Sequence, residues 1–340
     1  MTLQAYLADI HGGPDVLGVP AYDLSTNTNA CGPHGPTEQA VREANARHYP
    51  DPAYTALAIQ LAAWHGVAPS RIVLGASGSE LIQRISAAVA FQAAASSEEA
   101  SACWPMHAYG DYARAAQAAG LRHTEDAAQA SLIWACDPSS PLGQPHHGLA
   151  DVVERLKPTQ ALVLDQAYEP LRLSGALALD ADALDRIWRL MTPNKALGLT
   201  GVRAAYFLAP RTEPGLLPHL RALAPSWPLG AHGVALLQNW ATVDTHQWLA
   251  ECRATLRMWK ARQLELLAAA GWRAEAGLAN FLVVTREGVN MKTCLDALRQ
   301  KGIKLRDCAS FGLPGHMRMA VVEPDVQDIV MRALCEEDRI

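Results

Sequence analysis

The chain has 340 residues, of which half are hydrophobic and 19% are charged, and its formal net charge is −5. This length and apolar content are enough for a large buried core, and two unequal domains are expected. Because no basic stripe is present, we expect neither a nucleic-acid partner nor an anionic membrane surface. The seven cysteines are dispersed without a C-x-x-C pair, which is typical of reduced thiols in the cytoplasm.

No segment has the pattern of a targeting or membrane-spanning sequence. Residues 1–7 lack a basic stretch followed by an apolar one, so a signal peptide is not expected. The Ala-rich run at 82–95 is interrupted by polar side chains and is too short to span a bilayer. The adjacent His146 and His147 suit a solvated turn better than a metal site. We therefore expect a cytoplasmic protein without a bound metal.

Short apolar runs alternate with helical patterns through the first two thirds of the chain. A helix is predicted at 79–95, because Leu81, Ile82, Ile85 and Val89 share one face. The predicted strands are 71–75, 131–135, 161–164, 187–191 and 204–208. Such alternation predicts a mostly parallel sheet wrapped by helices.

The pattern changes after residue 225. Residues 230–269 form a long helical tract, with a break expected near Val243 and Asp244. Beyond it, strands are predicted at 280–285, 302–305 and 317–322, and helices at 291–300 and 326–335. We expect an N-terminal segment (1–30), a large domain (31–225) and a smaller α+β domain (226–340).

Polar side chains follow several predicted strands. Asp165 follows the strand at 161–164, and Lys195 comes shortly after the strand at 187–191. Ligands of open α/β sheets bind at the carboxyl ends of the strands, so both side chains are candidates for one site. Taken singly, Asp165 would be expected to cap a turn, and Lys195 to be solvated.

The loop at 75–80 reads Gly-Ala-Ser-Gly-Ser-Glu and separates a strand from a helix. Its glycines would let the backbone approach a phosphate, and the start of the helix offers free N–H groups. It is neither a P-loop nor a G-x-G-x-x-G motif. By itself it is better interpreted as a helix start capped by Ser77 or Ser79.

The order of these features resembles the fold-type I, pyridoxal 5′-phosphate (PLP) enzymes of the class I/II aminotransferase superfamily. Within it, the chain resembles the branch that contains histidinol-phosphate aminotransferase and threonine-phosphate decarboxylase. The similar stretches are 27–33 (N-E-N-P-x-G-P in the family), 49–51 (Y-P-D), 165–168 (D-E-A-Y), 192–203 (T-L-S-K-A-F-G-L-A-G-L-R), 310–314 (G-L-P) and 317–319 (L-R-I). The resemblance implies an α/β, fold-type I architecture and a site shared across a homodimer.

The resemblance also implies a role for each central residue. Lys195 would carry PLP as a Schiff base and then move the substrate Cα proton. Asp165 would keep the pyridine nitrogen protonated, and Tyr168 would donate to the cofactor 3′-oxygen. Arg318 would hold the substrate α-carboxylate in a bidentate pair, with Asn29 close to that carboxylate.

The resemblance implies further cofactor contacts around the phosphate and the ring. Arg203, eight residues after Lys195, would pair with the phosphate. The other implied polar contacts are Gly78, Ser79, Thr192, Asn194 and, from the partner subunit, Tyr49. Tyr109 is expected to stack on the ring, with Tyr112 as its rival. The position of Tyr112, eight residues before Gly120, matches the outer tyrosine of the family's P-x-[YF]-x-x-Y stretch and favours Tyr109.

The chain departs from the family at three of these positions. Ser140 stands where an asparagine would bond the cofactor 3′-oxygen, so that contact would run through water or be left to Tyr168. Gln166 replaces a glutamate, and Asn194 replaces a serine. These changes leave the substrate open.

Three functions are compatible with the sequence. The first is an aminotransferase acting on an L-amino acid and a 2-oxo acid, with a phosphorylated, histidinol-phosphate-like substrate as one option. The second is a decarboxylase of the threonine-phosphate type, from the cobalamin pathway. The third is a PLP-fold protein that only binds a ligand, which we rank last because Lys195 is retained and no DNA-binding segment is attached.

Overall fold

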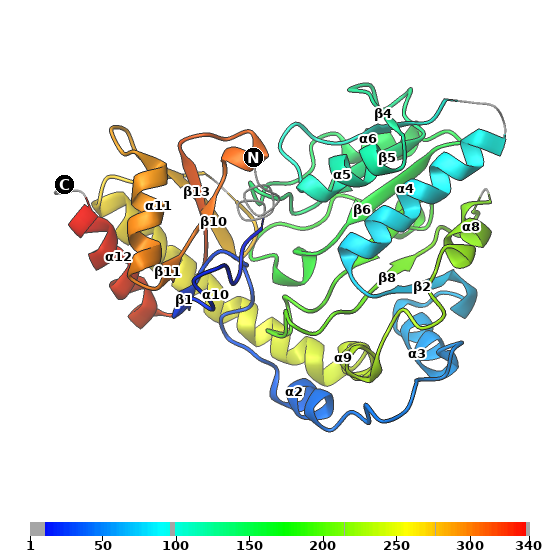
Figure 1. Cartoon of the computed structure of the whole chain (residues 1–340), viewed down its shortest axis with the longest axis horizontal. Coiled ribbons are helices and arrows are strands. Elements are labelled where there is room, and N and C mark those ends of the chain that lie inside the picture. Colours follow the sequence, from blue (N-terminus) through cyan, green and yellow to red (C-terminus); the bar gives the residue numbers. More distant parts are fainter. Residues whose placement is uncertain (1–10, 96–98, 214, 276, 338–340) are drawn as a thin grey trace.

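The computed structural model describes residues 11–95, 99–213, 215–275 and 277–337. Two bodies of secondary structure lie side by side in Figure 1, a large one built on a seven-stranded sheet and a smaller one built on a four-stranded sheet. Within the described ranges, no helix combines the length and apolarity needed to cross a membrane.

The large sheet is mostly parallel, as expected. Its strands are β2 (Ile72–Gly75), β3 (Ser101–Cys103), β4 (Arg122–His123), β5 (Leu132–Cys136), β6 (Ala161–Asp165), β7 (Trp188–Met191) and β8 (Ala205–Leu208). They are ordered β2-β8-β7-β6-β5-β3-β4, and only β8 runs antiparallel to its neighbours. Every residue of β5 and β6 is buried, which explains why both read as continuous apolar runs.

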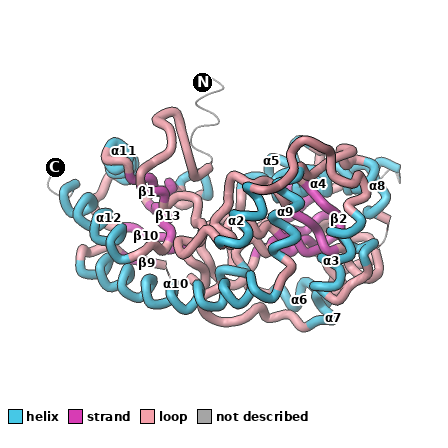
Figure 2. The backbone as a smooth tube through the Cα atoms, turned by 90° about the horizontal axis from the view of Figure 1, so that it is seen from below, coloured by secondary structure: helices cyan, strands magenta, loops and turns pink. Residues whose placement is uncertain are grey.

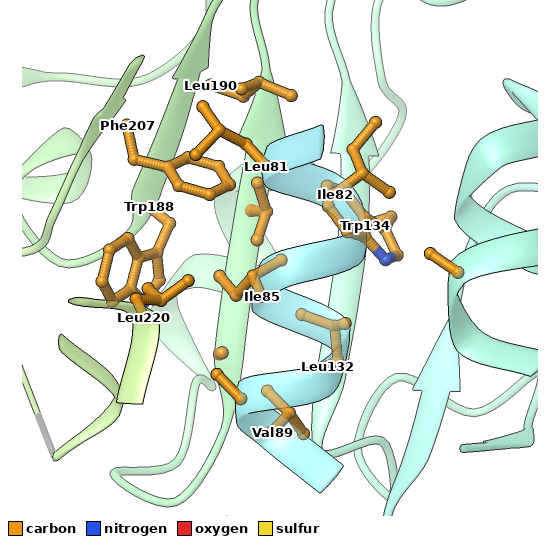
Figure 3. Packing of buried hydrophobic residues seen from close by; sticks show 14 of the residues in the cluster. Leu81, Ile82, Ile85, Val89, Leu132, Trp134, Trp188, Leu190, Phe207 and Leu220 are labelled. Carbon is orange, nitrogen blue, oxygen red and sulfur yellow. The ribbon is translucent and has the colours of Figure 1, made fainter. Parts of the chain in front are cut away.

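Three helices cover one face of this sheet: α4 (Gly78–Ala95), α5 (Gly110–Ala118) and α8 (Leu216–Ala222). Figure 3 shows α4 lying on the strands, with its apolar side chains directed toward them. Ile85 and Val89 of this helix belong to the same buried cluster as Trp134, Trp188 and Phe207 of the sheet. The 3.6-residue periodicity of 79–95 therefore marks the face that the sheet covers.

The opposite face is covered by a second set of helices. These are α3 (Thr55–His65), α6 (Leu149–Glu154), α7 (Ala181–Leu184), α9 (Ala231–Trp240) and the first half of α10 (Val243–Ala269), while α2 (Gly35–Arg42) packs on α9. Short 3-10 helices lie at Pro69–Arg71, Glu169–Leu171 and Ala309–Phe311. Side chains alternate along the strands, so that Leu132 and Trp134 face α4 while Ile133 and Ala135 face α6.

The smaller body follows α10 in the chain. Its sheet is antiparallel and ordered β12-β13-β10-β9, with β9 (Arg273–Ala274), β10 (Phe281–Thr285), β12 (Arg306–Asp307) and β13 (His316–Ala320). The helices α11 (Met291–Gln300) and α12 (Pro324–Glu337) pack against it. The strand β1 (Tyr22–Asp23) pairs in parallel with β11 (Ile303–Lys304), which brings the N-terminal segment to this body, as Figure 2 also shows.

The long helix α10 runs beneath both bodies in Figure 1. Its 27 residues correspond to about 40 Å. Leu249 and Leu256 pack with the large sheet, whereas Leu267 packs with the small one. The expected break of the helical tract lies at Ala241 and Thr242, where Thr242 caps α10. The domain limits remain a prediction. α9 and the first half of α10 come after residue 225 in the chain, but they pack with the large sheet.

Candidate active site

A cavity of about 610 Å³ lies where the carboxyl ends of the large sheet meet the smaller body. Every expected site residue except Asn29 and Tyr49 lines it. The expected residues in its lining are Gly78, Ser79, Tyr109, Ser140, Asp165, Tyr168, Thr192, Asn194, Lys195, Arg203 and Arg318. Residues from seven separate stretches of the chain thus converge, as the sheet-edge rule predicts.

Lys195 lies in the turn that follows β7, and its Nζ is 3.2 Å from the Tyr168 hydroxyl and 4.5 Å from the ring centroid. The turn is fixed by hydrogen bonds on both sides of the lysine. The Lys195 N–H donates to Asn194 Oδ1 at 3.1 Å, and the Lys195 carbonyl accepts from the Asn29 N–H at 3.0 Å. The amine is therefore held at a defined place in the cavity.

Tyr168 is a buried tyrosine with a polarised hydroxyl. Burial raises the pKa of Tyr168, but the positive charges of Lys195 and Arg318 outweigh it, and the net pKa shift is downward. The amide of Asn27 adds a hydrogen bond, donating from Nδ2 to the hydroxyl at 3.3 Å. A more acidic phenol is a stronger hydrogen-bond donor, which suits a contact with an anionic oxygen.

Asp165 ends β6 and is buried. Burial raises its pKa, and this shift is opposed by two hydrogen bonds and by the charge of Lys195. Tyr112 donates its hydroxyl proton to Oδ2 at 2.7 Å, and the Ala167 N–H donates to Oδ1 at 2.9 Å. Each carboxylate oxygen keeps acceptor capacity for a further donor.

The two tyrosines at the start of α5 take different places. Tyr109 lines the cavity, and its hydroxyl is 3.2 Å from Ser79 Oγ. Tyr112 is fully buried beneath the cavity and bonded to Asp165. Of the two, Tyr109 therefore has the position from which a ring can be stacked.

The glycine-rich loop and the end of β7 form one corner of the cavity. A Cβ atom at Gly78 would lie 2.8 Å from Thr192 Cγ2, so only glycine fits the present packing. The buried Thr192 Oγ1 has no hydrogen-bond partner within the described part of the chain. Ser77 Oγ accepts from the Glu80 N–H at 3.1 Å and so caps α4, whereas Ser79 lines the cavity.

Arg318 of β13 is buried, and its guanidinium is braced from both ends. Nη1 donates to Ser140 Oγ at 3.1 Å and Nη2 donates to the Ser25 carbonyl at 3.2 Å. Its Nε is buried without a partner among the described residues. Ser140 thus contacts the arginine in this structure.

Arg306 was missed by the sequence analysis. It stands directly opposite Arg318 in the β12–β13 pair, is 4% exposed, and lines the same cavity. The guanidinium carbon of Arg306 lies 4.9 Å from the centroid of Phe311, and that of Arg318 lies 5.5 Å from it. Arg306 Nη2 also donates to Ser310 Oγ at 2.7 Å.

Asn29, expected near the substrate carboxylate, is not among the residues that line the cavity and lies behind Lys195. Its Nδ2 donates to the Ala196 carbonyl at 3.0 Å, and its Oδ1 accepts from the Cys31 N–H at 3.1 Å. The backbone therefore takes both ends of this buried amide, which holds the chain behind Lys195. Tyr49 is 78% exposed and stacks on Trp227, with ring centroids 4.4 Å apart.

The N-terminal segment also contributes residues that the sequence analysis did not single out. His11, Gly12 and Gly13 line the cavity, and the His11 ring lies 6.0 Å from the ring of Tyr109. Burial lowers the pKa of His11, against the opposing effect of Asp111. The sequence analysis could not single out these residues, because a histidine followed by two glycines matches no known functional motif.

The cavity is cationic. In the described part of its lining, Lys195, Arg203, Arg306 and Arg318 stand against one carboxylate, Asp165. Such a balance favours a ligand with several negative charges. No group of three or more His, Cys, Asp and Glu side chains in the described ranges is placed to hold a metal ion.

A lysine in the turn after a strand, beside a tyrosine and a buried carboxylate in this α/β fold, defines the class of fold-type I enzymes that use PLP. Residues 20–336 match the family model of aminotransferases of class I and II, so the chain belongs to that family. The family and fold class expected from the sequence are thereby confirmed, and with them the class of enzyme, a PLP-dependent aminotransferase.

Curated relatives have similar lengths and modest identity. A histidinol-phosphate aminotransferase from Jannaschia sp. (strain CCS1) is 27% identical over 334 residues, covering 92% of this chain and 89% of the relative. One from Rhodospirillum rubrum is 28% identical over 336 residues, covering 92% and 88%.

Solved structures show the same fold. The histidinol-phosphate aminotransferase from Sinorhizobium meliloti in complex with pyridoxal-5′-phosphate has a TM-score of 0.80 at 21% identity, covering 100% of this chain and 97% of that one. The L-threonine-O-3-phosphate decarboxylase from Porphyromonas gingivalis has a TM-score of 0.79 at 17% identity, covering 93% and 99%.

Proposed function

We propose that this enzyme transfers an amino group between a substrate that carries two anionic groups and a 2-oxo acid. A phosphorylated amino acid, which has both a carboxylate and a phosphate group, belongs to this substrate class. The observation that carries the proposal is the pair of buried arginines, Arg306 and Arg318, in the cavity that holds Lys195.

The arginine pair places two guanidinium groups close together in the cavity. Like charges directly opposite each other on neighbouring strands repel, and burial removes the water that would screen them. Nearby protein contacts to the two guanidinium groups include uncharged acceptors, Ser140, Ser310 and the Ser25 carbonyl. A ligand with two negative groups, one for each arginine, would relieve this repulsion through charge-assisted hydrogen bonds.

The remaining polar groups of the cavity fit PLP. Thr192 Oγ1, which has no hydrogen-bond partner among the described residues, would hold its phosphate together with Ser79 and the cation of Arg203. The absence of a side chain at Gly78 would let the backbone approach. Asp165 would pair with the ring nitrogen, and Tyr168 with the 3′-oxygen. When bound, PLP supplies an electron sink for the negative charge left at the substrate Cα.

The Nζ atom of Lys195 would have two roles. Its Nζ would hold the cofactor, and once the substrate amine has displaced it, the same Nζ would take up and return the Cα proton. The Tyr168 hydroxyl, 3.2 Å away, keeps the amine on that side of the cavity. Arg318 would fix one anionic group of the substrate, so that the C–H bond faces Lys195.

Decarboxylation is the alternative. The structural likeness to the threonine-phosphate decarboxylase and the two arginines are equally compatible with a phosphorylated amino acid that loses its carboxylate. The two reactions differ in which Cα bond faces the amine. A ligand-binding protein without activity is the least supported option, because the chain retains Lys195, and Asp165 and Tyr168 line the same cavity.

A panel of anionic amino compounds tests the proposal. We expect the protein with PLP to convert a phosphorylated amino acid to its oxo product and to leave the cofactor as pyridoxamine phosphate. Release of CO₂ with the amine retained would establish the decarboxylase instead. Lys195→Ala should fold and lose both reactions, and substantial turnover by this variant would contradict the assignment. If the wild-type protein with added PLP shows no cofactor absorption, both enzyme functions fail.

A further inference from the structure

Tyr112 lies beneath the cavity and contacts Asp165, but it is not part of the cavity lining. Its side chain is fully buried, and its hydroxyl donates to Asp165 Oδ2 at 2.7 Å. This distance is typical of a short hydrogen bond to a charged acceptor. The function of this contact rests on the proposed function, since it concerns how Asp165 meets PLP.

The ring of Tyr112 is held on two sides. It stacks on Trp134 of β5, with centroids 4.5 Å apart and an angle of 8° between the planes. It also meets Tyr109 edge to face, with centroids 5.8 Å apart. Because both neighbours are anchored in the core or the cavity wall, the hydroxyl of Tyr112 has a fixed direction.

The hydrogen bond matters because Asp165 is buried. A carboxylate that faces a protonated ring nitrogen must be ionised, and burial opposes ionisation. The Tyr112 hydroxyl and the Ala167 N–H each bind one carboxylate oxygen, so together they favour the charged form and fix the plane of the group. Tyr112 supplies the larger of these two opposing effects on the pKa of Asp165.

We propose that Tyr112 is a positioning residue, whose hydroxyl keeps Asp165 ionised and oriented to pair with the pyridine nitrogen of PLP. The effect of Tyr112 on PLP is then exerted through the ring nitrogen and no other cofactor atom. The role of Tyr112 therefore differs from that of Tyr109, whose side chain lines the cavity itself.

Titration of the apoprotein with PLP tests this directly. In Tyr112→Phe we expect the Kd for PLP to rise about 10-fold or more, because a hydrogen bond to a charged group is lost. The same substitution should change the Kd by less than about 2-fold for a PLP analogue in which carbon replaces the ring nitrogen, since such an analogue has no use for the ionised carboxylate. In an Asp165→Asn background, Tyr112→Phe should likewise leave the Kd for PLP nearly unchanged.

Tyr206→Phe is the matched control. Tyr206 is also fully buried and hydrogen-bonded, to Trp240 and His65, but it does not line the cavity. Its loss should affect thermal unfolding and leave the Kd for PLP unchanged. If Tyr112→Phe does not fold, Tyr112→His, which retains a ring and an N–H donor, should fold and keep more PLP affinity than Asp165→Asn.

The outcomes separate the two proposals. Wild-type apoprotein that fails to bind PLP would overturn the proposed function and this inference together. Tight wild-type binding with an unchanged Kd in Tyr112→Phe would overturn the inference alone. An equal loss of affinity for PLP and for the carbon analogue would also overturn it, because the effect would then be general damage to the cavity.

Discussion

At the scale of single residues, the cavity depends on how its buried charged groups are stabilised by hydrogen bonds and nearby charges. Asp165 is stabilised by two hydrogen-bond donors and by Lys195, and Tyr168 is polarised by Lys195 and Arg318. The guanidinium groups of Arg306 and Arg318 contact Ser310, Ser140 and the Ser25 carbonyl. The proposed substrate anions would bind these two guanidinium groups.

Arg306→Gln tests the need for a second anionic group. For a substrate with two anions, we expect kcat/KM to fall about 10- to 100-fold, because one charge-assisted contact is lost. For an analogue that lacks the second anion, the fall should be less than about 3-fold. Steady-state kinetics with both compounds measures the difference. Arg273→Gln, a substitution of an exposed arginine of the same small sheet, is the control and should change neither value. Equal losses for both substrates would argue against a role in substrate choice.

At the scale of elements, the site needs α4 to begin against the end of β7. A Cβ atom added at Gly78 would lie 2.8 Å from Thr192 Cγ2, so the helix start packs tightly against the residue that follows the strand. Apolar periodicity alone decides that α4 packs on the sheet, but this contact decides where the helix N–H groups point.

Gly78→Ala should disrupt that contact. A helix interior gains about 1 kcal/mol from alanine, yet the new Cβ would lie 2.8 Å from Thr192 Cγ2 and force α4 away. We expect a net loss of about 1 to 3 kcal/mol in the free energy of unfolding and weaker PLP binding, measured by urea unfolding and PLP titration. Adding Thr192→Ser, which removes the methyl group and keeps the hydroxyl, should restore much of both. Stabilisation by Gly78→Ala alone would show that the contact is not constraining.

The packing of α3 on β8 should make stability depend on pH. Burial lowers the pKa of His65 to about 4, and its Nε2 is 2.8 Å from the Tyr206 hydroxyl. The unfolded chain, with a pKa near 6.5, binds the proton more readily, so stability is present above pH 6.5 and is lost as pH falls toward 4.

His65→Gln removes this titration. Between pH 7.5 and 5, we expect the variant to lose about 1 to 2 kcal/mol less unfolding free energy than the wild type. Urea unfolding at the two pH values measures the difference. The exposed His48, substituted in the same way, should leave the pH dependence as it is. If the unfolding free energy of His65→Gln depended on pH as strongly as that of the wild type, His65 would not be buried in its neutral form.

At the scale of the whole molecule, we propose a homodimer whose sites are shared between subunits. Tyr49 does not line the cavity of its own chain, and its exposed ring rests on Trp227. The family resemblance places this tyrosine at the phosphate of the partner subunit, and its exposure is compatible with that position.

Complementation tests the shared site. Lys195→Ala and Tyr49→Ala should each lose most of their activity when assayed alone. When the two are unfolded together and refolded, half of the dimers should be hybrids with one intact site, giving about a quarter of the wild-type activity. Size-exclusion chromatography checks that dimers form. Hybrid dimers without recovered activity would place Tyr49 outside the site.

Much of this protein could be predicted from its sequence. Buried strands such as β5 and β6 show as apolar runs, because a strand covered on both faces has no polar side. The strand-end rule made Asp165 and Lys195 candidates, since the carboxyl ends of parallel strands meet at one edge. The family resemblance added Tyr168 and Arg318. Short strands such as β3 and β12 gave no such signal, because two or three residues are too few to show a period.

Only the tertiary structure decided which side chains meet across long stretches of chain. The register of β12 with β13 places Arg306 opposite Arg318, and a one-residue shift would have turned it to the other face. The packing of α5 brings the Tyr112 hydroxyl within hydrogen-bond distance of Asp165, and the amide of Asn29 binds the backbone behind Lys195. The sequence alone thus determined that lysine, carboxylate and arginine would form one site. Contacts between distant residues, which follow from packing and not from any local pattern, decided the site's charge and its supporting hydrogen bonds.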